Sequence, residues 1–408
     1  MKKLLIASSF LISTFALTPP SQAQQTATVE VFDQPIELQL GGYMTWYTTY
    51  ANQKKTTAIL ESDRVTLRPI GSYNNVDVMG DAEIYFSGST TLRNGVKIGA
   101  MIQLEAGTDS DTSNHTIDET YMTVDSGIGR VIVGNVKNVS NQMSVTSPTV
   151  STLGLQETDF RRLLVGPGNF AYNKATYALL DDISTKLSYI TPTFSGFTFG
   201  ISLMPGNKKK GKDSDDLLIP NDGIKLFRYG VDTTALFQHD FGKFNIEASA
   251  SYTMYKPNLR ANAPENPGMN LAFAEEKNIN EYGAGLNIGF GNWSVGGSYH
   301  YTNLSEITGL FLNPYANVAK GSSWDFGVEY TAGPFGVSAN VFQSRAESLL
   351  VNDKKDIYSV YLVSGQYKIL AGVDAFIDIA YLDFDSASRN PAASNKGPAV
   401  AIGMNLNF

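Results

Sequence analysis

Apolar and polar residues alternate along the last nine residues of the chain. Val400, Ile402, Met404, Leu406 and Phe408 are apolar, and the residues between them are small or polar. A period of two is typical of a β-strand with one apolar face and one polar face. A soluble protein seldom ends beside a fully apolar strand face. The closing strand of an outer-membrane β-barrel does so, because its outer face meets lipid.

The same alternation recurs along the chain and predicts sixteen strands. In the segment 96–106, Ile98 and Ile102 alternate with Lys97 and Glu105. The charged side chains should therefore line water inside a barrel while the apolar ones face lipid. Most of the segments approach the roughly 9–11 residues that a tilted strand needs to cross a bilayer. The expected strands are 36–50, 81–91, 96–106, 117–125, 129–136, 182–191, 196–204, 227–239, 243–256, 278–289, 293–303, 322–331, 335–346, 356–368, 373–384 and 397–408.

The connections between these strands alternate in length. The short ones, such as Arg93-Asn94-Gly95, carry the Gly, Asn, Asp and Pro residues that tight hairpins use. Strict alternation places the short turns at one rim and the long loops at the other. The sequence therefore predicts an all-β fold, a transmembrane antiparallel 16-stranded β-barrel with short periplasmic turns and long external loops. The longer, polar connections are 51–80, 107–116, 137–181, 205–226, 257–277, 304–321, 347–355 and 385–396.

Aromatic residues gather near the ends of the predicted strands, where the interfacial girdles of a membrane barrel lie. They are Trp46, Tyr47, Tyr50, Tyr252, Tyr255, Trp293, Tyr299, Tyr301 and Tyr381. On periodicity alone, aromatic residues packed in an ordinary β core stay open as an alternative.

The first 23 residues have the pattern of a secretory signal peptide. Lys2 and Lys3 precede an apolar stretch at 4–17, which is too short to span a bilayer. Two prolines interrupt it, and the sequence at 21–23 fits a small-residue cleavage site. Residues 1–23 are therefore the expected signal peptide, and residues 24–408 the expected single barrel domain.

Composition narrows the functional classes. With Lys2 and Lys3 removed, 29 basic and 39 acidic residues remain, a formal charge of −10. This charge argues against nucleic acid as a partner and favours a mild cation preference in a channel. The chain has no cysteine, which excludes disulfides, thiolate zinc sites and a cysteine nucleophile. No run of 18 apolar residues follows residue 23, so a membrane-spanning helix is not expected.

Three stretches resemble the general porins of Gram-negative bacteria, especially the alphaproteobacterial kind. They are 81–97, 117–134 and 187–197. They are similar to a hairpin of the family, to the strand pair before its constriction loop and to the hairpin after that loop. The terminal Phe408 resembles the family's assembly signal, although Leu406 stands where an aromatic residue is common. The resemblance implies a homotrimer in the outer membrane, in contact with lipid and lipopolysaccharide and inserted by the barrel insertion machinery.

The longest connection, 137–181, is the expected constriction loop, which in the family is the third external loop and folds inward. There, acidic loop residues face basic residues of the pore wall, and a transverse field acts on the solute. Asn135 follows Gly134 where the family commonly has an arginine, which weakens the expected basic cluster. Solvated loop charges without a pore role stay open as the alternative for each residue. The expected loop residues are Glu157, Asp159, Arg161 and Arg162, and the expected wall residues are Lys137, Asn135, Arg64, Arg68, Lys97 and Glu105.

These features predict a porin with a water-filled channel for passive diffusion of small hydrophilic solutes and ions. One alternative is a structural or adhesive barrel with a plugged lumen. Another is a substrate-specific channel, which would require a row of aromatic side chains along the pore, an aromatic slide. Tyr172, Tyr177 and Tyr189 are too few to argue for such a slide.

No enzymatic activity and no cofactor are expected. Ser298 and His300 lie two residues apart on one predicted strand face. A polar, lumen-facing histidine explains this spacing better than the site of an outer-membrane phospholipase. Acidic groups at 109–111 and 213–216 could hold Ca²⁺ or other divalent cations on external loops, but solvated acidic loops account for them better.

Overall fold

The computed structural model describes most of the chain between Ala27 and Phe408. The described residues are 27–29, 35–53, 59–60, 67–68, 74–106, 117–156, 160–167, 170–178, 183–206, 227–257, 277–304, 319–390 and 393–408. Within these ranges, no helix has the length and apolar character that crossing a membrane requires.

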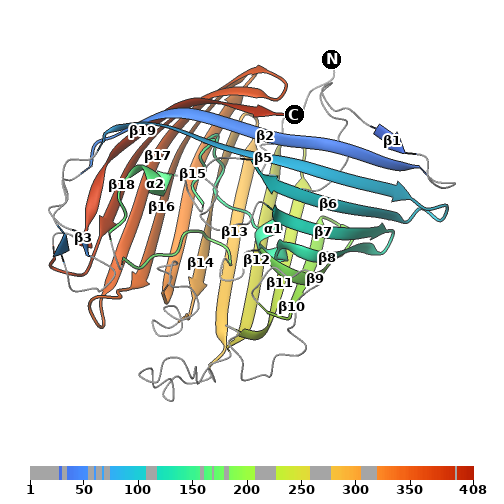
Figure 1. Ribbon diagram of the computed structural model, residues 1–408, viewed down its shortest axis with the longest axis horizontal. Coiled ribbons are helices and arrows are strands. Elements are labelled where there is room, and N and C mark those ends of the chain that lie inside the picture. The colour runs from blue at the N-terminus through green and yellow to red at the C-terminus, as the bar shows by residue number, and fades with distance from the viewer. Residues whose placement is uncertain are drawn as a thin grey trace.

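Sixteen antiparallel strands form a closed β-barrel (Figure 1). Each strand pairs with the one before it and the one after it along the chain, and the ring closes where the last pairs with the first. The predicted fold class is confirmed. The strands are β2 Ile36–Ala51, β5 Val76–Thr91, β6 Lys97–Glu105, β7 Ile117–Ser126, β8 Gly129–Lys137, β9 Ile183–Ile190, β10 Phe197–Met204, β11 Phe227–Asp240, β12 Phe244–Pro257, β13 Ile279–Phe290, β14 Trp293–Thr302, β15 Gly321–Ala332, β16 Phe335–Glu347, β17 Lys355–Leu370, β18 Val373–Asp385 and β19 Asn395–Asn407.

The C-terminal strand closes the barrel, as predicted. Asn407 lies opposite Tyr43 in the β19–β2 ladder. The backbone N–H of Phe408 donates to Gly42 O at 3.0 Å, and Gly42 N donates to Phe408 O at 2.9 Å. Closure leaves each of the sixteen strands with a partner on both edges, which removes the hazard of an exposed strand edge.

The observed strands agree with the predicted ones to within a few residues, with one larger difference. β5 begins at Val76 rather than at 81, because the alternation of Val76 and Val78 with Asp77 continues the strand outward. The short and long connections alternate as predicted. Three further short strands are not predicted by the pattern. β1 (Ala27–Val29) pairs with the start of β2, and β3 (Ile59–Leu60) pairs with β4 (Leu67–Arg68) between β2 and β5.

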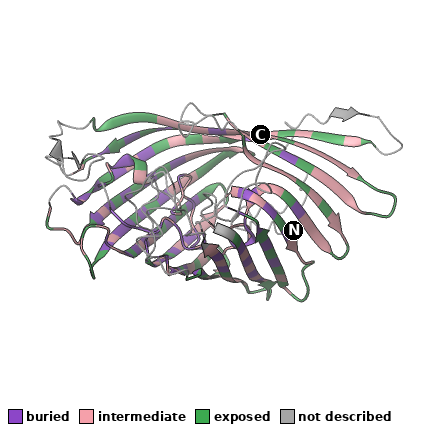
Figure 2. Ribbon diagram, turned by 60° about the horizontal axis from the view of Figure 1, so that its bottom comes forward, coloured by how far each residue is buried: buried purple, intermediate pink, exposed green. Residues whose placement is uncertain are grey.

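The two faces of the strands differ in burial (Figure 2). The outward face exposes large apolar side chains such as Trp46, Phe199 and Trp293, each more than half exposed, as a lipid-facing surface requires. The inward face is buried or half-buried. Tyr47 and Tyr255 lie on this inward face, with 4% and 0% exposure. The prediction that these two residues belong to an interfacial girdle is therefore wrong. Each lies an odd number of residues from the exposed residues of its strand, so its side chain points to the other face.

The last strands of the barrel are apolar on both faces. Tyr361 and Val363 on β17 and Ile377 and Ile379 on β18 are exposed on the outside. The inward positions carry a buried cluster that includes Phe342, Tyr358, Val360, Leu362, Phe376, Leu382, Phe384, Ala399 and Ala401. A strand covered on both faces reads as a nearly continuous apolar run. This side of the wall therefore needs a covering segment from inside the barrel.

Candidate functional site

The segment between β8 and β9 crosses the space that the strands enclose (Figure 1). It begins at Asn138 and contains two short helices, α1 (Val139–Gln142) and α2 (Phe160–Leu163). Its described residues contact inward-facing side chains on strands from β10 to β19 and on β2. These contacts are of three kinds: hydrogen bonds to carboxylates, hydrogen bonds to hydroxyl groups, and apolar packing.

Four buried aspartates accept hydrogen bonds from backbone amides of this segment. The donors are backbone groups, so the path of the segment at these points does not depend on its own side chains. Hydrogen bonds to an ionised acceptor are roughly twice as strong as neutral ones. The bonds run from Ser140 N to Asp232 at 2.7 Å, Ser147 N to Asp325 at 3.0 Å, Leu153 N to Asp378 at 3.4 Å and Ala171 N to Asp356 at 3.1 Å.

Asp325 on β15 joins three separate parts of the segment. Besides Ser147 N, it accepts bonds from Thr176 Oγ1 at 3.3 Å and from the side-chain amide of Gln156. It also accepts the backbone N–H of Ser298 on the neighbouring strand at 2.7 Å. With four donors and 3% exposure, this carboxylate is satisfied although it lies away from water.

Inward-facing serines continue the same arrangement between the aspartates. Because their strands follow one another around the barrel, the first part of the segment runs along the inner circumference. Val139 N donates to Ser202 Oγ on β10 at 3.1 Å, Val145 N to Ser249 on β12 at 2.8 Å, Val150 N to Ser338 on β16 at 3.2 Å and Asn173 N to Ser344 on β16 at 2.8 Å.

Glycines on the inward face let the segment approach the backbone of the wall. A Cβ atom added to Gly285 on β13 would overlap the carbonyl group of Val145. One added to Gly327 on β15 would lie 2.8 Å from Pro148 O, closer than real Cβ contacts. These two positions therefore require glycine for the close approach and not for a special backbone conformation.

The second part of the segment packs into the apolar inner face of β16 to β19. Phe170 meets Phe384 edge-on with ring centroids 5.4 Å apart, and Tyr172 meets Tyr358 at 5.2 Å. Leu153, Leu155, Leu163 and Leu164 of the segment belong to the same cluster and are at most 7% exposed. Fully burying one such side chain contributes about 1.5–3 kcal/mol. This contact therefore fixes the segment against one side of the barrel.

Arg161 lies at the edge of this apolar cluster. Its guanidinium group donates to Tyr172 OH and lies 5.8 Å from the centre of the Tyr172 ring. Burial raises the pKa of Tyr172, and the positive charge of Arg161 opposes that rise. Arg162, the next residue of α2, is exposed. The two predicted loop arginines thus differ, since Arg161 is used in packing and Arg162 faces away from it.

Carboxylates gather on the inward faces of β5 to β7. Glu83, Glu105 and Asp118 each place an oxygen within 4.8 Å of the others. Glu83 also accepts bonds from Tyr85 OH at 2.8 Å and Tyr43 OH at 3.2 Å. A register shift in the β6–β7 ladder beside Asp118 turns its side chain toward the cluster. These groups are half-buried, in contrast to the covered aspartates beneath the segment.

Lys97 and Glu105, two of the predicted wall residues, lie at the two ends of β6 and alternate with its outward-facing residues. Asn135 lies on the outward face of its strand, β8. Its side chain accepts a bond from Thr185 at 2.6 Å and donates to Thr120 at 3.1 Å, on the same face as exposed Val133. The expectation that Asn135 lines the lumen therefore does not fit the strand's alternation. Lys137 lies two residues further on and therefore has the same outward-facing position in the strand.

Several predicted sites lie outside the described residues. They are Arg64, Glu157, Asp159, the acidic groups at 109–111 and 213–216, and the signal peptide 1–23. Of Arg68 only the backbone is described, as the second residue of β4.

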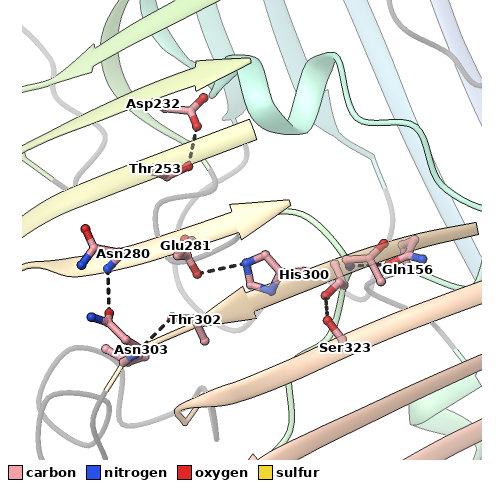
Figure 3. Close-up of polar contacts among 12 residues, drawn as sticks. Gln156, Asp232, Thr253, Asn280, Glu281, His300, Thr302, Asn303 and Ser323 are labelled. Carbon is pink, nitrogen blue, oxygen red and sulfur yellow. Dashed lines mark hydrogen bonds and ion pairs between the residues drawn. The ribbon is translucent and has the colours of Figure 1, made fainter. Parts of the chain in front are cut away.

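Ser298 and His300 do not form a serine–histidine pair. Ser298 Oγ lies 2.5 Å from Thr176 Oγ1. His300 Nε2 instead lies 3.5 Å from Glu281 Oε1 (Figure 3). Within the described residues, neither ring nitrogen of His300 makes a hydrogen bond. The arrangement does not supply the base that would activate a serine nucleophile.

The closed sixteen-stranded barrel encloses a long segment, and the sequence as a whole matches a known family. The sequence model described as Gram-negative porin matches residues 7–387. The chain belongs to the Gram-negative porin family. This porin is an outer-membrane channel protein that crosses the membrane with β-strands.

The curated relatives are full-length matches of low identity. Uncharacterized proteins of Rickettsia conorii and Rickettsia felis are 21% and 22% identical to this porin over 461 and 464 aligned residues. A third, from Rickettsia prowazekii, is 22% identical over 464 residues. In each case the alignment covers 100% of both chains.

Solved porins share the fold. The anion-selective porin from Comamonas acidovorans has a TM-score of 0.59 at 13% identity, and the match covers 91% of this chain and all of that one. The outer membrane channel DcaP of Acinetobacter baumannii has a TM-score of 0.58 at 12% identity, covering 91% and 97%. A mutant of the Rh. blastica porin has a TM-score of 0.51 at 14% identity. At these identities the likeness shows the fold alone.

The residues that anchor the segment are not among the predicted site residues. Asp232, Asp325, Asp356 and Asp378 occupy inward positions of β11, β15, β17 and β18, where any lumen-facing polar residue would fit. They anchor the segment by accepting hydrogen bonds from backbone amides far away in the sequence. The pattern of a single strand cannot show such bonds. The apolar inner face of the last strands did have a sequence signal, since the run 357–363 is apolar at most positions of both faces.

Proposed function

We propose that this porin forms a water-filled channel for passive diffusion of small hydrophilic solutes and ions across the outer membrane. The observation that carries the proposal is the asymmetric filling of the barrel. The β8–β9 segment is bonded to the inner wall of β10 to β18, whereas the inward carboxylates of β5 to β7 are half-buried. A sixteen-stranded barrel is wide enough to keep an aqueous channel beside such a segment.

In this proposal the segment narrows the channel from one side and so limits solute size. Its many bonds to the wall make it a fixed element rather than a freely moving loop. The Arg161 and Arg162 positions then mark the side of the passage formed by α2, and Lys97 and Glu105 belong to the wall at β6. Glu157, Asp159, Arg64 and Arg68 remain proposed contributors on the strength of the family resemblance.

The channel prefers cations in this proposal. Glu83, Glu105 and Asp118 concentrate negative charge on the wall of β5 to β7, and an acidic lumen raises the local concentration of cations. The solved neighbour from Comamonas acidovorans is anion-selective by its title. Selectivity can differ within one fold because it depends on the lining charges and not on the strand order.

The aromatic side chains do not favour a substrate-specific channel. Tyr172 is buried against Tyr358 and Phe384. Tyr189 donates its hydroxyl to Ile128 O beside the short turn between β7 and β8. Two of the three tyrosines considered for an aromatic slide are therefore used for packing and for a turn contact.

Assembly as a homotrimer, secretion with removal of residues 1–23, and contact with lipopolysaccharide are proposed from the family resemblance. Phe408 is the proposed signal for the insertion machinery. Phe408 is 43% exposed in the closed barrel, and its backbone completes the closing ladder.

Liposome swelling with sugars of increasing size tests this function. Vesicles that contain the purified porin should swell in small sugars, and the rate should fall steeply with solute size because the segment narrows the passage. Vesicles without protein give the baseline. Swelling that equals this baseline for every sugar contradicts an open channel and favours the plugged barrel.

A further inference from the structure

The inward faces of β5 to β8 differ in charge between their two ends. We call these faces the open wall, because their charged side chains all stay partly exposed. At one end, Glu83, Glu105 and Asp118 place oxygens within 4.8 Å of one another. Glu105 is the last residue of β6, and Asp118 is the second residue of β7. The long connection between these two strands joins them there, so the carboxylates lie toward the end of the long loops.

Lys97, Asp125 and Arg130 form a row at the other end of the open wall. Lys97 lies opposite Asp125 in the β6–β7 ladder, and Asp125 lies opposite Arg130 in the β7–β8 ladder. Arg130 and Asp125 form an ion pair. Two positive charges and one negative charge leave this row with one net positive charge. The row adjoins the short turns between β5 and β6 and between β7 and β8.

The distance between the two groups is longer than the range of screened charges at moderate salt. Lys97 and Glu105 lie eight residues apart on β6. This spacing is about 26 Å along a strand that rises roughly 3.3 Å per residue, and about 20 Å along the axis of a barrel with strands tilted by roughly 40°. The Debye length in 0.1 M salt is about 10 Å. Each end of the open wall therefore acts separately on the ions that pass it.

The rest of the short-turn end has no comparable negative group. Its charges include Lys368, which acts on both Glu329 and Asp374, and Glu329 is buried with 3% exposure. Among the described residues, Glu83, Glu105 and Asp118 are the only three carboxylates that lie within 4.8 Å of one another. The negative charge of the passage is therefore concentrated toward the end of the long loops.

The geometry points to a channel that rectifies, with a larger current when cations move from the end of the long loops to the end of the short turns. An acidic wall concentrates cations beside it. A voltage that drives cations inward carries this enriched solution toward Lys97, which slows their exit, so ions accumulate in the passage. The opposite voltage removes cations through the acidic end faster than the other end supplies them, and the passage is depleted. The inference rests on the proposed function, because it needs an open passage along this wall.

Single-channel current–voltage curves in 0.1 M KCl test the rectification. The current should be about twofold larger when the voltage drives cations inward, and the two currents should become equal in 1 M KCl, where the Debye length is about 3 Å. The orientation of each channel is read with N94C, since the chain has no cysteine of its own and Asn94 lies in the exposed turn between β5 and β6. Streptavidin added to one chamber changes the current only of biotin-labelled channels whose short turns face that chamber. Equal currents in 0.1 M KCl contradict the rectification alone, whereas a bilayer without any current contradicts the proposed function and the rectification with it.

Charge variants separate the rectification from the cation preference. K97E makes both ends of the open wall negative, so the two currents should become equal while the preference for potassium over chloride is kept. E83Q/E105Q should lose both properties. The control K243E makes the same charge change in the exposed turn between β11 and β12, away from the open wall, and should keep the native ratio of currents. A native ratio in K97E, or an equal loss of rectification in K97E and K243E, overturns the assignment to the open wall.

Discussion

Replacing Asp325 with alanine should release part of the β8–β9 segment from the wall. The carboxylate accepts bonds from Ser147 N, Thr176 Oγ1 and Gln156 Nε2 of the segment. These donors come from three places in the segment and end on one side chain. The D325A change therefore removes the acceptor of these three donors and of Ser298 N on the neighbouring strand.

The size of the effect follows from these bonds. A hydrogen bond to a charged group contributes roughly 1.5–3 kcal/mol. Bonds within one network are not additive, so we assign about 3 kcal/mol to the three together. This amount corresponds to a factor of about 150 in the local equilibrium between the bound and released segment. The bonds to Asp232 and Asp378 remain, so release should be confined to the stretch near residues 145–156 and 176.

Hydrogen exchange and current noise measure this release. The amides of 145–150 should exchange about 100-fold faster in D325A, and the open-channel current should fluctuate more. The control is D374A, which removes an inward carboxylate of β18 next to the turn at 371–372. It should leave both measurements near native values. Native-like exchange and noise in D325A would refute the view that Asp325 anchors the segment.

Three further predictions use other parts of the structure. Replacing Gly285 with valine should displace the segment and change the single-channel conductance, because the valine side chain would overlap the Val145 carbonyl group. The control is G127A, where the added methyl group would lie in open space, and equal conductance of the two variants would contradict the close approach. The double variant E83Q/E105Q should lower the zero-current potential of a KCl gradient toward that of a non-selective pore; an unchanged potential would remove these residues from the conducting path. Deleting Phe408 should reduce the amount of assembled barrel severalfold, which heat-modifiable mobility in electrophoresis measures. The conductance of inserted channels should stay unchanged, and a normal yield of assembled barrel would argue against an assembly role for Phe408.

The strand order was accessible from sequence because each strand carries its own signal. The alternation of Ile98 and Ile102 with Lys97 and Glu105 depends only on neighbouring residues and on the membrane outside. The same holds for the turns, where glycine supplies the conformation that tight hairpins need. The family resemblance added the role of the longest connection, which periodicity alone could not assign.

The site was harder to predict because its contacts join residues far apart in the chain. Ser147 and Asp325 are bonded, yet nothing in either local sequence indicates the other. Tyr47 looked like a girdle residue because it adjoins Trp46. Successive side chains of a strand point to opposite faces, however, so Tyr47 points inward where Trp46 points outward. Asn135 was assigned to the wall by comparison with an arginine of related porins, and the alternation of β8 places it on the outer face with Val133.

Planar-bilayer recording of the purified porin is the most direct test of the central claim. A water-filled channel held open beside a fixed segment predicts discrete conductance steps that scale with salt concentration, with a zero-current potential of the sign for potassium over chloride. Steps in multiples of three would add support for a trimer. A bilayer that stays silent after confirmed insertion of folded barrels would contradict the account, and a potential that favours chloride would contradict its assignment of the acidic wall to the conducting path.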